Sequence, residues 1–139
     1  MTNRQLGEIL RHQKPVTLPP GASVREACRR MVEQRVGAIL VGGPKGRLLG
    51  IFTGRDAVRC LAIAVDPGAM QLRDVMTRDP ETMPPGSTAI EALRLMRDGG
   101  FRHIPALDQG IPVGVVSRGD FCGSEQDRLD AETGIWERV

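Results

Sequence analysis

The chain has 139 residues, of which 40% are hydrophobic and only 3% aromatic, and its formal net charge is +2. From this length we expect one ordinary domain or two small halves that share a core, without a separate catalytic domain beside them. The near-neutral charge, spread along the chain, and the absence of tyrosine argue against nucleic acid as a partner, because single-strand binders need stacking platforms and a basic groove.

The predicted elements come in two similar sets. Residues 15–41 match residues 80–106 without a gap when the sequence is shifted by 65, and ten of these 27 positions are identical. Self-similarity at this period is the mark of a duplicated structural unit. We therefore expect one repeat over residues 1–70, a second over 71–123, and a C-terminal tail over 124–139.

The first repeat is predicted to run strand, helix, strand, strand, helix. Its first helix begins at Ser23, because a hydroxyl residue followed three positions later by glutamate forms a capping box worth about 1 kcal/mol. The apolar residues behind this cap share one helical face: Val24, Ala27, Cys28 and Met31. The runs "VGAILVG" and "LLGIF" then predict adjacent strands, and "TGRDAVRCLAIAV" predicts a second helix.

The second repeat carries the same signals in the same order. Thr88 and Glu91 form its capping box. The buried stripe of its first helix is Ala89, Ala92, Leu93 and Met96. "HIPAL" and "PVGVV" predict the strand pair, and "SRGDFCGSEQ" predicts a shorter second helix, interrupted by Gly123.

A seven-residue motif recurs where the second helix of each repeat begins, as "GIFTGRD" at 50–56 and as "GVVSRGD" at 114–120. If Thr53 and Ser117 cap these helices, unsatisfied backbone N–H groups and the positive end of the helix dipole beside them favour a phosphate. One turn later, an ionised aspartate is an acceptor that suits the two hydroxyl donors of a ribose. The glycines leave room for a ligand or for tight strand packing.

A plain structural interpretation competes with this one. A hydroxyl residue followed three positions later by aspartate is also an ordinary helix start, in which the acid only favours the dipole. The duplication together with the glycine and strand context favours at least one working nucleotide site.

The repeated unit, the stretch "VMTRDPETMPPGSTAIEAL", the "FRHIPAL" strand and the two motifs together resemble a pair of cystathionine-β-synthase (CBS) domains, known as a Bateman module, over nearly all of residues 6–122. The resemblance implies an α+β fold of two β-α-β-β-α repeats with pseudo-two-fold symmetry, with the sheets packed together and the helices outside. It further implies a stand-alone cytoplasmic regulatory protein that binds an adenosine-containing ligand between the repeats, AMP first, with ADP, ATP, NAD(H) or S-adenosylmethionine as alternatives. It implies no enzymatic reaction.

The resemblance also implies which residues line two clefts, since each cleft draws on both repeats. The first would combine Thr53, Arg55 and Asp56 with Thr77, Arg78, Thr82, Phe101, Arg102 and His103. The second would combine Ser117, Arg118 and Asp120 with His12, Thr17, Val36, Gly37 and Ala38. The first cleft is richer in arginine, whose planar fork suits phosphate oxygens, so we expect it to hold phosphate more tightly.

Other chemistry finds little support in the sequence. The two histidines, His12 and His103, lack a cysteine or carboxylate at metal-ligand spacing, so we expect no metal. The three cysteines are widely spaced and have no base arranged near them, as in a reducing cytoplasm. We expect neither an apolar leader nor a run that crosses a membrane. In the tail, we expect Trp136 to pack on its own domain or, as the alternative, on a partner subunit.

Three functions remain open from sequence. The first and favoured is a sensor whose shape changes when an adenine nucleotide binds and whose regulated partner protein is unidentified. The second is a ligand-independent dimerisation or docking module with vestigial clefts. The third, a nucleotide-processing or nucleic-acid-binding protein, is disfavoured by the scattered charge. The resemblance implies a symmetric homodimer formed through exposed apolar helix faces, here around Leu61, Ile63, Ala64 and Val65.

Overall fold

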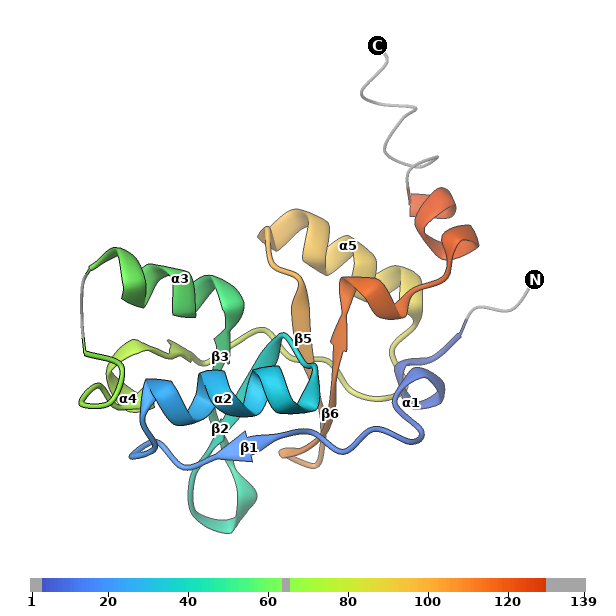
Figure 1. Ribbon diagram of the computed structural model, residues 1–139. Coiled ribbons are helices and arrows are strands. Elements are labelled where there is room, and N and C mark those ends of the chain that lie inside the picture. The colour runs from blue at the N-terminus through green and yellow to red at the C-terminus, as the bar shows by residue number, and fades with distance from the viewer. Residues whose placement is uncertain (1–3, 64–65, 130–139) are drawn as a thin grey trace. The chain divides into compact units, whose positions relative to one another are not determined.

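The computed structural model describes residues 4–63 and 66–129, which form two compact units (Figure 1). The first-repeat unit holds the described residues of 14–81 with 109–112, and the second-repeat unit holds those of 4–13, 82–108 and 113–129. The predicted α+β class is confirmed. The predictions made for Ala64 and Val65 and for Trp136 in the tail lie outside the described residues.

The first-repeat unit is built on a four-stranded sheet with strand order β1-β2-β3-β4. Its strands are β1 (Thr17–Leu18), β2 (Ala38–Gly42), β3 (Leu48–Thr53) and β4 (Thr77–Arg78). β1 and β2 are parallel, and the other neighbours are antiparallel. The predicted adjacency of the two core strands is therefore confirmed.

The helices of this unit follow the predicted caps and stripes. They are α2 (Val24–Gln34), α3 (Gly54–Ala62) and α4 (Leu72–Val75), with the 3-10 turn η1 (Pro44–Gly46) between β2 and β3. Ser23 caps α2, because its Oγ accepts a hydrogen bond from the N–H of Glu26 at 3.0 Å. Val24 and Ala27 are buried in the core, where they meet Phe52 of β3.

The second-repeat unit repeats the plan with shorter elements. It contains α1 (Leu6–Ile9), α5 (Ala89–Gly99), β5 (His103–Asp108), β6 (Ile111–Ser117), whose first two residues group with the other unit, and the 3-10 turn η2 (Arg118–Asp120). β5 and β6 form a two-stranded sheet, and a single parallel bridge from Met83 to Ala106 stands where β1 pairs with β2 in the first repeat. The capping box at Thr88 and the buried stripe of α5 are confirmed.

The predicted interruption of the last helix at Gly123 is wrong by two residues. The helical turn stops at Phe121, whose backbone is extended and whose ring is buried in the core, and a new helical segment covers residues 123–129. The N–H of Cys122 donates to the Glu125 carboxylate at 2.9 Å, which caps this new start. The break thus coincides with the buried ring of Phe121 and not with Gly123.

Two segments flank the repeats, residues 4–13 and 70–81, and each packs against the body of the other repeat. The N–H of Leu6 donates to the carbonyl of Ser87 at 2.8 Å, and the N–H of Leu72 donates to that of Ala22 at 2.9 Å. Leu6 and Leu72 are fully buried in the cores of the second-repeat and first-repeat units, respectively. Each unit therefore combines the body of one repeat with the flanking segment that begins the other, a division that differs from the boundary after residue 70.

Candidate functional site

The first motif forms a complete capping box at the junction of β3 and α3. Both the N–H and the Oγ1 of Thr53 donate to Asp56 Oδ2, at 2.9 and 3.2 Å. The N–H of Asp56 lies 3.5 Å from Thr53 Oγ1. The predicted helix start at Thr53 is therefore confirmed, and one carboxylate oxygen is committed to it.

The other oxygen of Asp56 also has partners inside the first-repeat unit. Asp56 Oδ1 lies 3.4 Å from the Thr77 hydroxyl and 3.5 Å from Arg59 Nη1. The side chain of Asp56 is buried, with the residue only 3% exposed. Four donors thus meet a carboxylate that has about four lone-pair positions, and they make Asp56 an internal anchor of this unit.

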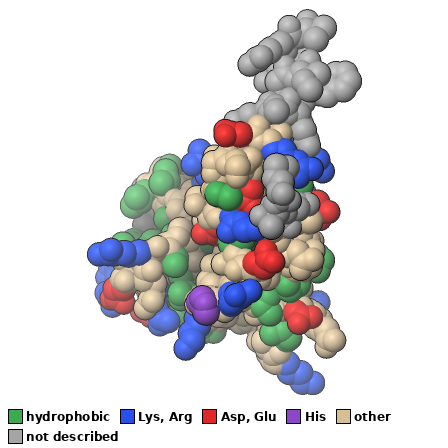
Figure 2. Space-filling model, turned by 90° about the vertical axis from the view of Figure 1, so that its right-hand side faces the viewer, with side chains coloured by type: hydrophobic (Ala, Val, Ile, Leu, Met, Phe, Trp, Pro, Cys, Tyr) green, Lys and Arg blue, Asp and Glu red, His purple; other side chains and the backbone are tan. Residues whose placement is uncertain are grey.

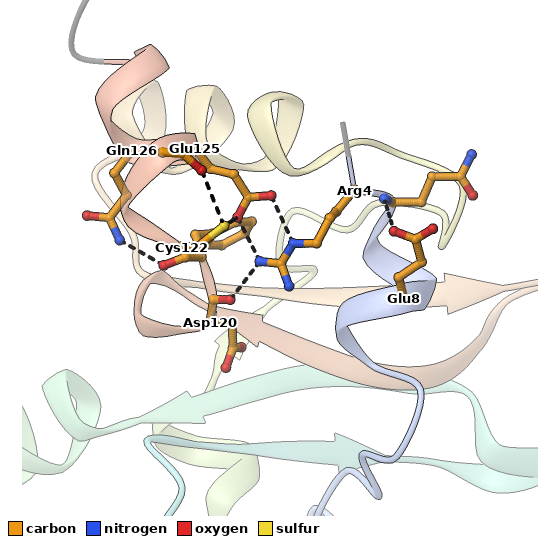
Figure 3. A network of polar contacts seen from close by, with 9 residues as sticks. Arg4, Glu8, Asp120, Cys122, Glu125 and Gln126 are labelled. Atoms are coloured by element: carbon orange, nitrogen blue, oxygen red, sulfur yellow. Dashed lines mark hydrogen bonds and ion pairs between the residues drawn. The ribbon is translucent and has the colours of Figure 1, made fainter. Parts of the chain in front are cut away.

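The second motif has the same box but a different setting. The N–H and Oγ of Ser117 donate to Asp120 Oδ2, at 2.7 and 3.2 Å. Asp120 is exposed, and among the residues that the structure describes no donor is recorded for its Oδ1. Its carboxylate points away from the guanidinium of Arg4 (Figure 3). Of the two motif aspartates, Asp120 is the one whose second oxygen is available to a ligand.

The backbone donors at the two turns are less available than expected from sequence. The N–H of Gly54 donates to the carbonyl of Gly37 at 3.2 Å, and the N–H of Arg118 donates to that of Arg102 at 3.0 Å. The expectation that these groups are unsatisfied is therefore wrong for both first residues of the turns. The three-residue η2 also provides almost no helix dipole, so phosphate binding at the second motif would depend on side chains.

His103 lies near Asp120 in the second-repeat unit. Burial lowers the pKa of the His103 imidazole below 6.5; the Asp120 carboxylate acts in the opposite direction, and the Arg102 guanidinium adds to the lowering. Burial therefore favours the neutral imidazole, which has one nitrogen as donor and one as acceptor. The unit thus brings the Asp120 carboxylate, the His103 imidazole and the Arg102 guanidinium within electrostatic reach of one another, with the hydroxyl of Ser117 bonded to that carboxylate.

The motif glycines serve tight packing. A Cβ on Gly50 would lie 2.7 Å from the carbonyl oxygen of Thr77 and 2.7 Å from the sulfur of Met76. A Cβ on Gly114 would lie 2.8 Å from Gln13 Oε1. Of the two roles considered from sequence, close packing is therefore the one observed, and in both units the flanking segment lies against the glycine.

The flanking segments correspond at a shift of 66, one more than the bodies of the repeats. The N–H of Ala89 donates to the carbonyl of Arg4, as the N–H of Val24 does to that of Met70. Arg4 and Met70 are therefore equivalent. By the same shift, Arg11 rather than His12 stands at the position of Thr77, a correspondence that the 65-residue shift of the bodies does not reveal.

The residues predicted for each cleft divide between the units. From the first cleft, the first-repeat unit holds Thr53, Arg55, Asp56, Thr77 and Arg78, and the second-repeat unit holds Thr82, Phe101, Arg102 and His103. From the second cleft, the second-repeat unit holds His12, Ser117, Arg118 and Asp120, and the first-repeat unit holds Thr17, Val36, Gly37 and Ala38. Within a unit, each motif meets the start of its own core strand, as in the pairing of Ala38 with Thr53. The joining of the two halves of each cleft stays a prediction.

Arg59 and Gln13 are among the residues that contact the motifs but were not predicted from the sequence. Arg59 forms the ion pair with Asp56, and its signal was the spacing of three from the aspartate on one helix. Gln13 accepts a hydrogen bond from the N–H of Val115, next to Gly114. Nothing in the local pattern around Gln13 predicts this contact, because it depends on the exchange of flanking segments.

Other side chains show how reactive groups are distributed. Burial raises the pKa of the Cys28 and Cys60 thiols. Within 4–63 and 66–129, no three His, Cys, Asp or Glu side chains gather as a metal ion would need, and no helix is long and apolar enough to span a bilayer. Figure 2 shows basic and acidic side chains interspersed on the face that it presents.

Comparison with known proteins gives a consistent picture. The family model of the CBS domain matches residues 6–63 and 72–125. The chain is 41% identical over 108 residues to the CBS domain-containing protein CBSCBSPB3 of Arabidopsis thaliana, an alignment that covers 77% of this chain and 19% of that protein. The chain thus spans about a fifth of the length of this relative.

Two solved structures share the fold. The CBS domain NE2398 has a TM-score of 0.79 and 28% sequence identity, with 86% of this chain and 94% of that chain covered. The CBS domain protein PAE2072 from Pyrobaculum aerophilum, complexed with AMP, has a TM-score of 0.83 and 25% identity, with 92% and 99% covered. The predicted pair of repeats and their fold are confirmed by these matches.

Proposed function

This chain belongs to the CBS domain family, with two copies of the domain in tandem, and on that premise we propose that it is a regulatory module that binds an adenosine-containing ligand. AMP is the first candidate, because a structure with the same fold is a complex with AMP. ADP, ATP, NAD(H) and S-adenosylmethionine share the adenosine that the motif would recognise. The proposed role is binding and signalling, with no chemical step.

The observation that carries the proposal is the accessible carboxylate of Asp120 beside Ser117. Its second oxygen is an acceptor for the hydroxyl groups of a ribose. Arg118 follows Ser117 directly, and a guanidinium suits phosphate oxygens. The resemblance assigned His103 to the first cleft, but its half-buried ring lies near Asp120, where it adds a donor and an acceptor. These groups rank the Ser117–Asp120 motif first, whereas the arginine count alone favoured the Thr53–Asp56 motif.

We propose that the ligand acts by selecting one shape of the module, which a separate partner protein reads. A ligand shifts such an equilibrium only by its differential affinity for the two shapes. A site that draws residues from both units would have this property, because the ligand contacts then depend on how the units are placed.

A ligand-independent docking module is the second candidate. The first-repeat unit exposes large apolar side chains on α2 and α3: Val32 is 78% exposed, Val58 65% and Leu61 75%. The internal role of Asp56 also fits a motif that only caps a helix. This candidate predicts that the protein binds its partner equally well with or without nucleotide.

The testing experiment compares two matched substitutions, Asp120→Asn and Asp56→Asn, in a thermal-shift and calorimetric titration with AMP. AMP at about 100 times its dissociation constant should stabilise the wild type by about 2.7 kcal/mol, a shift of several degrees. Asp120→Asn should abolish this shift and lower the unliganded midpoint less than Asp56→Asn does, because the amide oxygen can still accept the Ser117 hydrogen bonds. Asp56→Asn should lower the unliganded midpoint, because a buried carboxylate with several donors is worth about 1–3 kcal/mol.

Two results would contradict the proposal. A full AMP shift in the Asp120→Asn variant would remove Asp120 from the site. If AMP, ATP, NADH and S-adenosylmethionine all leave the midpoint of nucleotide-free protein unchanged, the docking module replaces the sensor.

A further inference from the structure

A cluster of charged side chains joins the two ends of the second-repeat unit (Figure 3). The guanidinium of Arg4 grips the carboxylate of Glu125 with two hydrogen bonds, Nε to Oε2 at 3.0 Å and Nη2 to Oε1 at 2.7 Å. The same Nη2 donates to the backbone carbonyl of Asp120 at 3.1 Å. We call this arrangement of Arg4, Glu125 and the Asp120 carbonyl the terminal clamp.

The carboxylate in the clamp is largely shielded from water and accepts several hydrogen bonds. The Glu125 side chain is only 10% exposed and that of Arg4 32%. The Cys122 N–H and thiol also donate to Glu125 Oε1, at 2.9 and 3.0 Å. The hydrogen bond from Arg4 is the main cause that lowers the pKa of Glu125 to about 2. The carboxylate is therefore ionised throughout the neutral range, and the fork geometry is that of a strong charge-assisted pair.

The clamp acts where the backbone of the second motif has least support. Asp56 is the third residue of the nine-residue α3, so its carbonyl lies where a helical hydrogen bond can hold it. Asp120 ends the three-residue η2, and the chain then turns extended at Phe121. Arg4 is the side chain that ties the Asp120 carbonyl to the helical segment beyond this break.

The corresponding positions of the first repeat, Met70 and Leu61, cannot form an equivalent ion pair. The residue equivalent to Arg4 is Met70, as the shared backbone contacts with α2 and α5 show. Glu125 lies five residues after Asp120, and the residue five after Asp56 is Leu61. Methionine and leucine cannot make this ion pair, so the clamp belongs to the repeat whose motif helix is broken.

We propose that Arg4 and Glu125 are positioning residues for the Ser117–Asp120 motif. By holding the Asp120 carbonyl, the clamp fixes the backbone from which the Asp120 carboxylate projects. In the first repeat, α3 holds the backbone of Asp56 instead. The effect on ligand affinity rests on the proposed function, whereas the effect on the order of the motif does not.

The first test needs no ligand. Amide hydrogen exchange of Ser117, whose N–H donates to Asp120 Oδ2, reports whether the motif is held. The exchange rate of the Ser117 amide should rise at least tenfold in Arg4→Ala and in Glu125→Gln. In Arg4→Lys the rate should lie between those of the wild type and Arg4→Ala, because lysine keeps the charge but cannot form the paired hydrogen bonds of a guanidinium. The amide of Thr53, in the matching box of the first motif, should not change.

Two controls separate positioning from simple loss of stability. Ile90→Val weakens the core of the same unit without removing a clamp residue, and Arg30→Ala removes an ion pair in the other unit. Neither should quicken exchange at Ser117. Two results would overturn the proposal. One is that Ile90→Val, at the same loss of thermal midpoint as Arg4→Ala, speeds exchange of the Ser117 amide as much as Arg4→Ala does. The other is that Arg4→Ala leaves this exchange rate unchanged.

The second test measures AMP affinity by calorimetry. Arg4→Ala should weaken binding about tenfold while Ile90→Val leaves it unchanged; equal affinity of Arg4→Ala and wild type would overturn the positioning of the site. If the wild type binds no adenosine compound, the proposed function fails, and the exchange experiment still decides the role of the clamp.

Discussion

The environment of His103 makes the stability of the protein depend on pH in a stated direction. Burial lowers the pKa of its imidazole in the folded state, whereas the unfolded chain keeps a value of about 6.5. Between these two values the unfolded state binds a proton that the folded state does not, so the free energy of unfolding rises with pH. Stability should therefore be lost as the pH falls below about 6.5.

Chemical denaturation at a series of pH values measures this effect. The slope should stay below the one-proton limit of about 1.4 kcal/mol per pH unit, because the half-buried ring is still partly screened by water. His103→Gln should flatten the curve in this window. Asp120→Asn should lower the His103 pKa further, as followed by NMR titration, since the Asp120 carboxylate raises it. An unchanged His103 pKa in this variant would contradict an electrostatic interaction between the two groups.

Single residues also show where prediction from sequence succeeds and stops. The boxes at Thr53 and Ser117 were predictable, because a cap depends on residues three positions apart. The contrast between buried Asp56 and exposed Asp120 was not, since the motifs contain the same types of residue. It depends on neighbours: Asp56 meets Arg59, and the residue three after Asp120 is Gly123.

At the level of elements, periodicity predicted α2, α5 and the paired core strands, because each is a local pattern of burial. The same patterns carry no information on which body a flanking segment packs against. The exchange that places Leu6 and Leu72 in opposite cores is thus visible only in the folded chain, and so is the end of the last helical turn at Phe121.

The contact between β3 and β4 can be tested at Gly50. Gly50→Ala should destabilise the protein by about 1–3 kcal/mol, the usual effect of overpacking, because the new Cβ would lie 2.7 Å from the backbone oxygen of Thr77. Gly54→Ala is the matched control, since a Cβ there meets nothing within 4 Å and alanine favours a helix. Urea denaturation measures the free energy of unfolding of both variants. Equal stability of Gly50→Ala and the wild type would contradict the close contact between Gly50 and β4.

The whole molecule reuses one unit in two different ways. In the first repeat a complete helix follows the motif and its aspartate is turned inward. In the second, the helix is broken, the aspartate is exposed and a charged pair from both ends of the unit supports it. Because each unit buries a leucine from the other repeat's flanking segment, a cut after residue 70 removes a core side chain from both.

Self-association is the property of the whole molecule that the exposed apolar surface of the first-repeat unit predicts. Val58, Leu61 and Ile63 lie on or just beyond α3 and are 60% to 75% exposed, and burying a leucine side chain contributes about 1.5–3 kcal/mol. In a symmetric dimer each substitution counts twice, so Leu61→Asp should weaken association by about 3 kcal/mol, more than a hundredfold. Analytical ultracentrifugation should show a wild-type dimer and a Leu61→Asp monomer that remains folded, with Lys45→Asp, an exposed change in η1, as the control. If the wild type is a monomer at all concentrations, this surface does not form a homodimer and is available to a different protein, as the docking module requires. If Leu61→Asp is still a dimer, the dimer contact lies elsewhere.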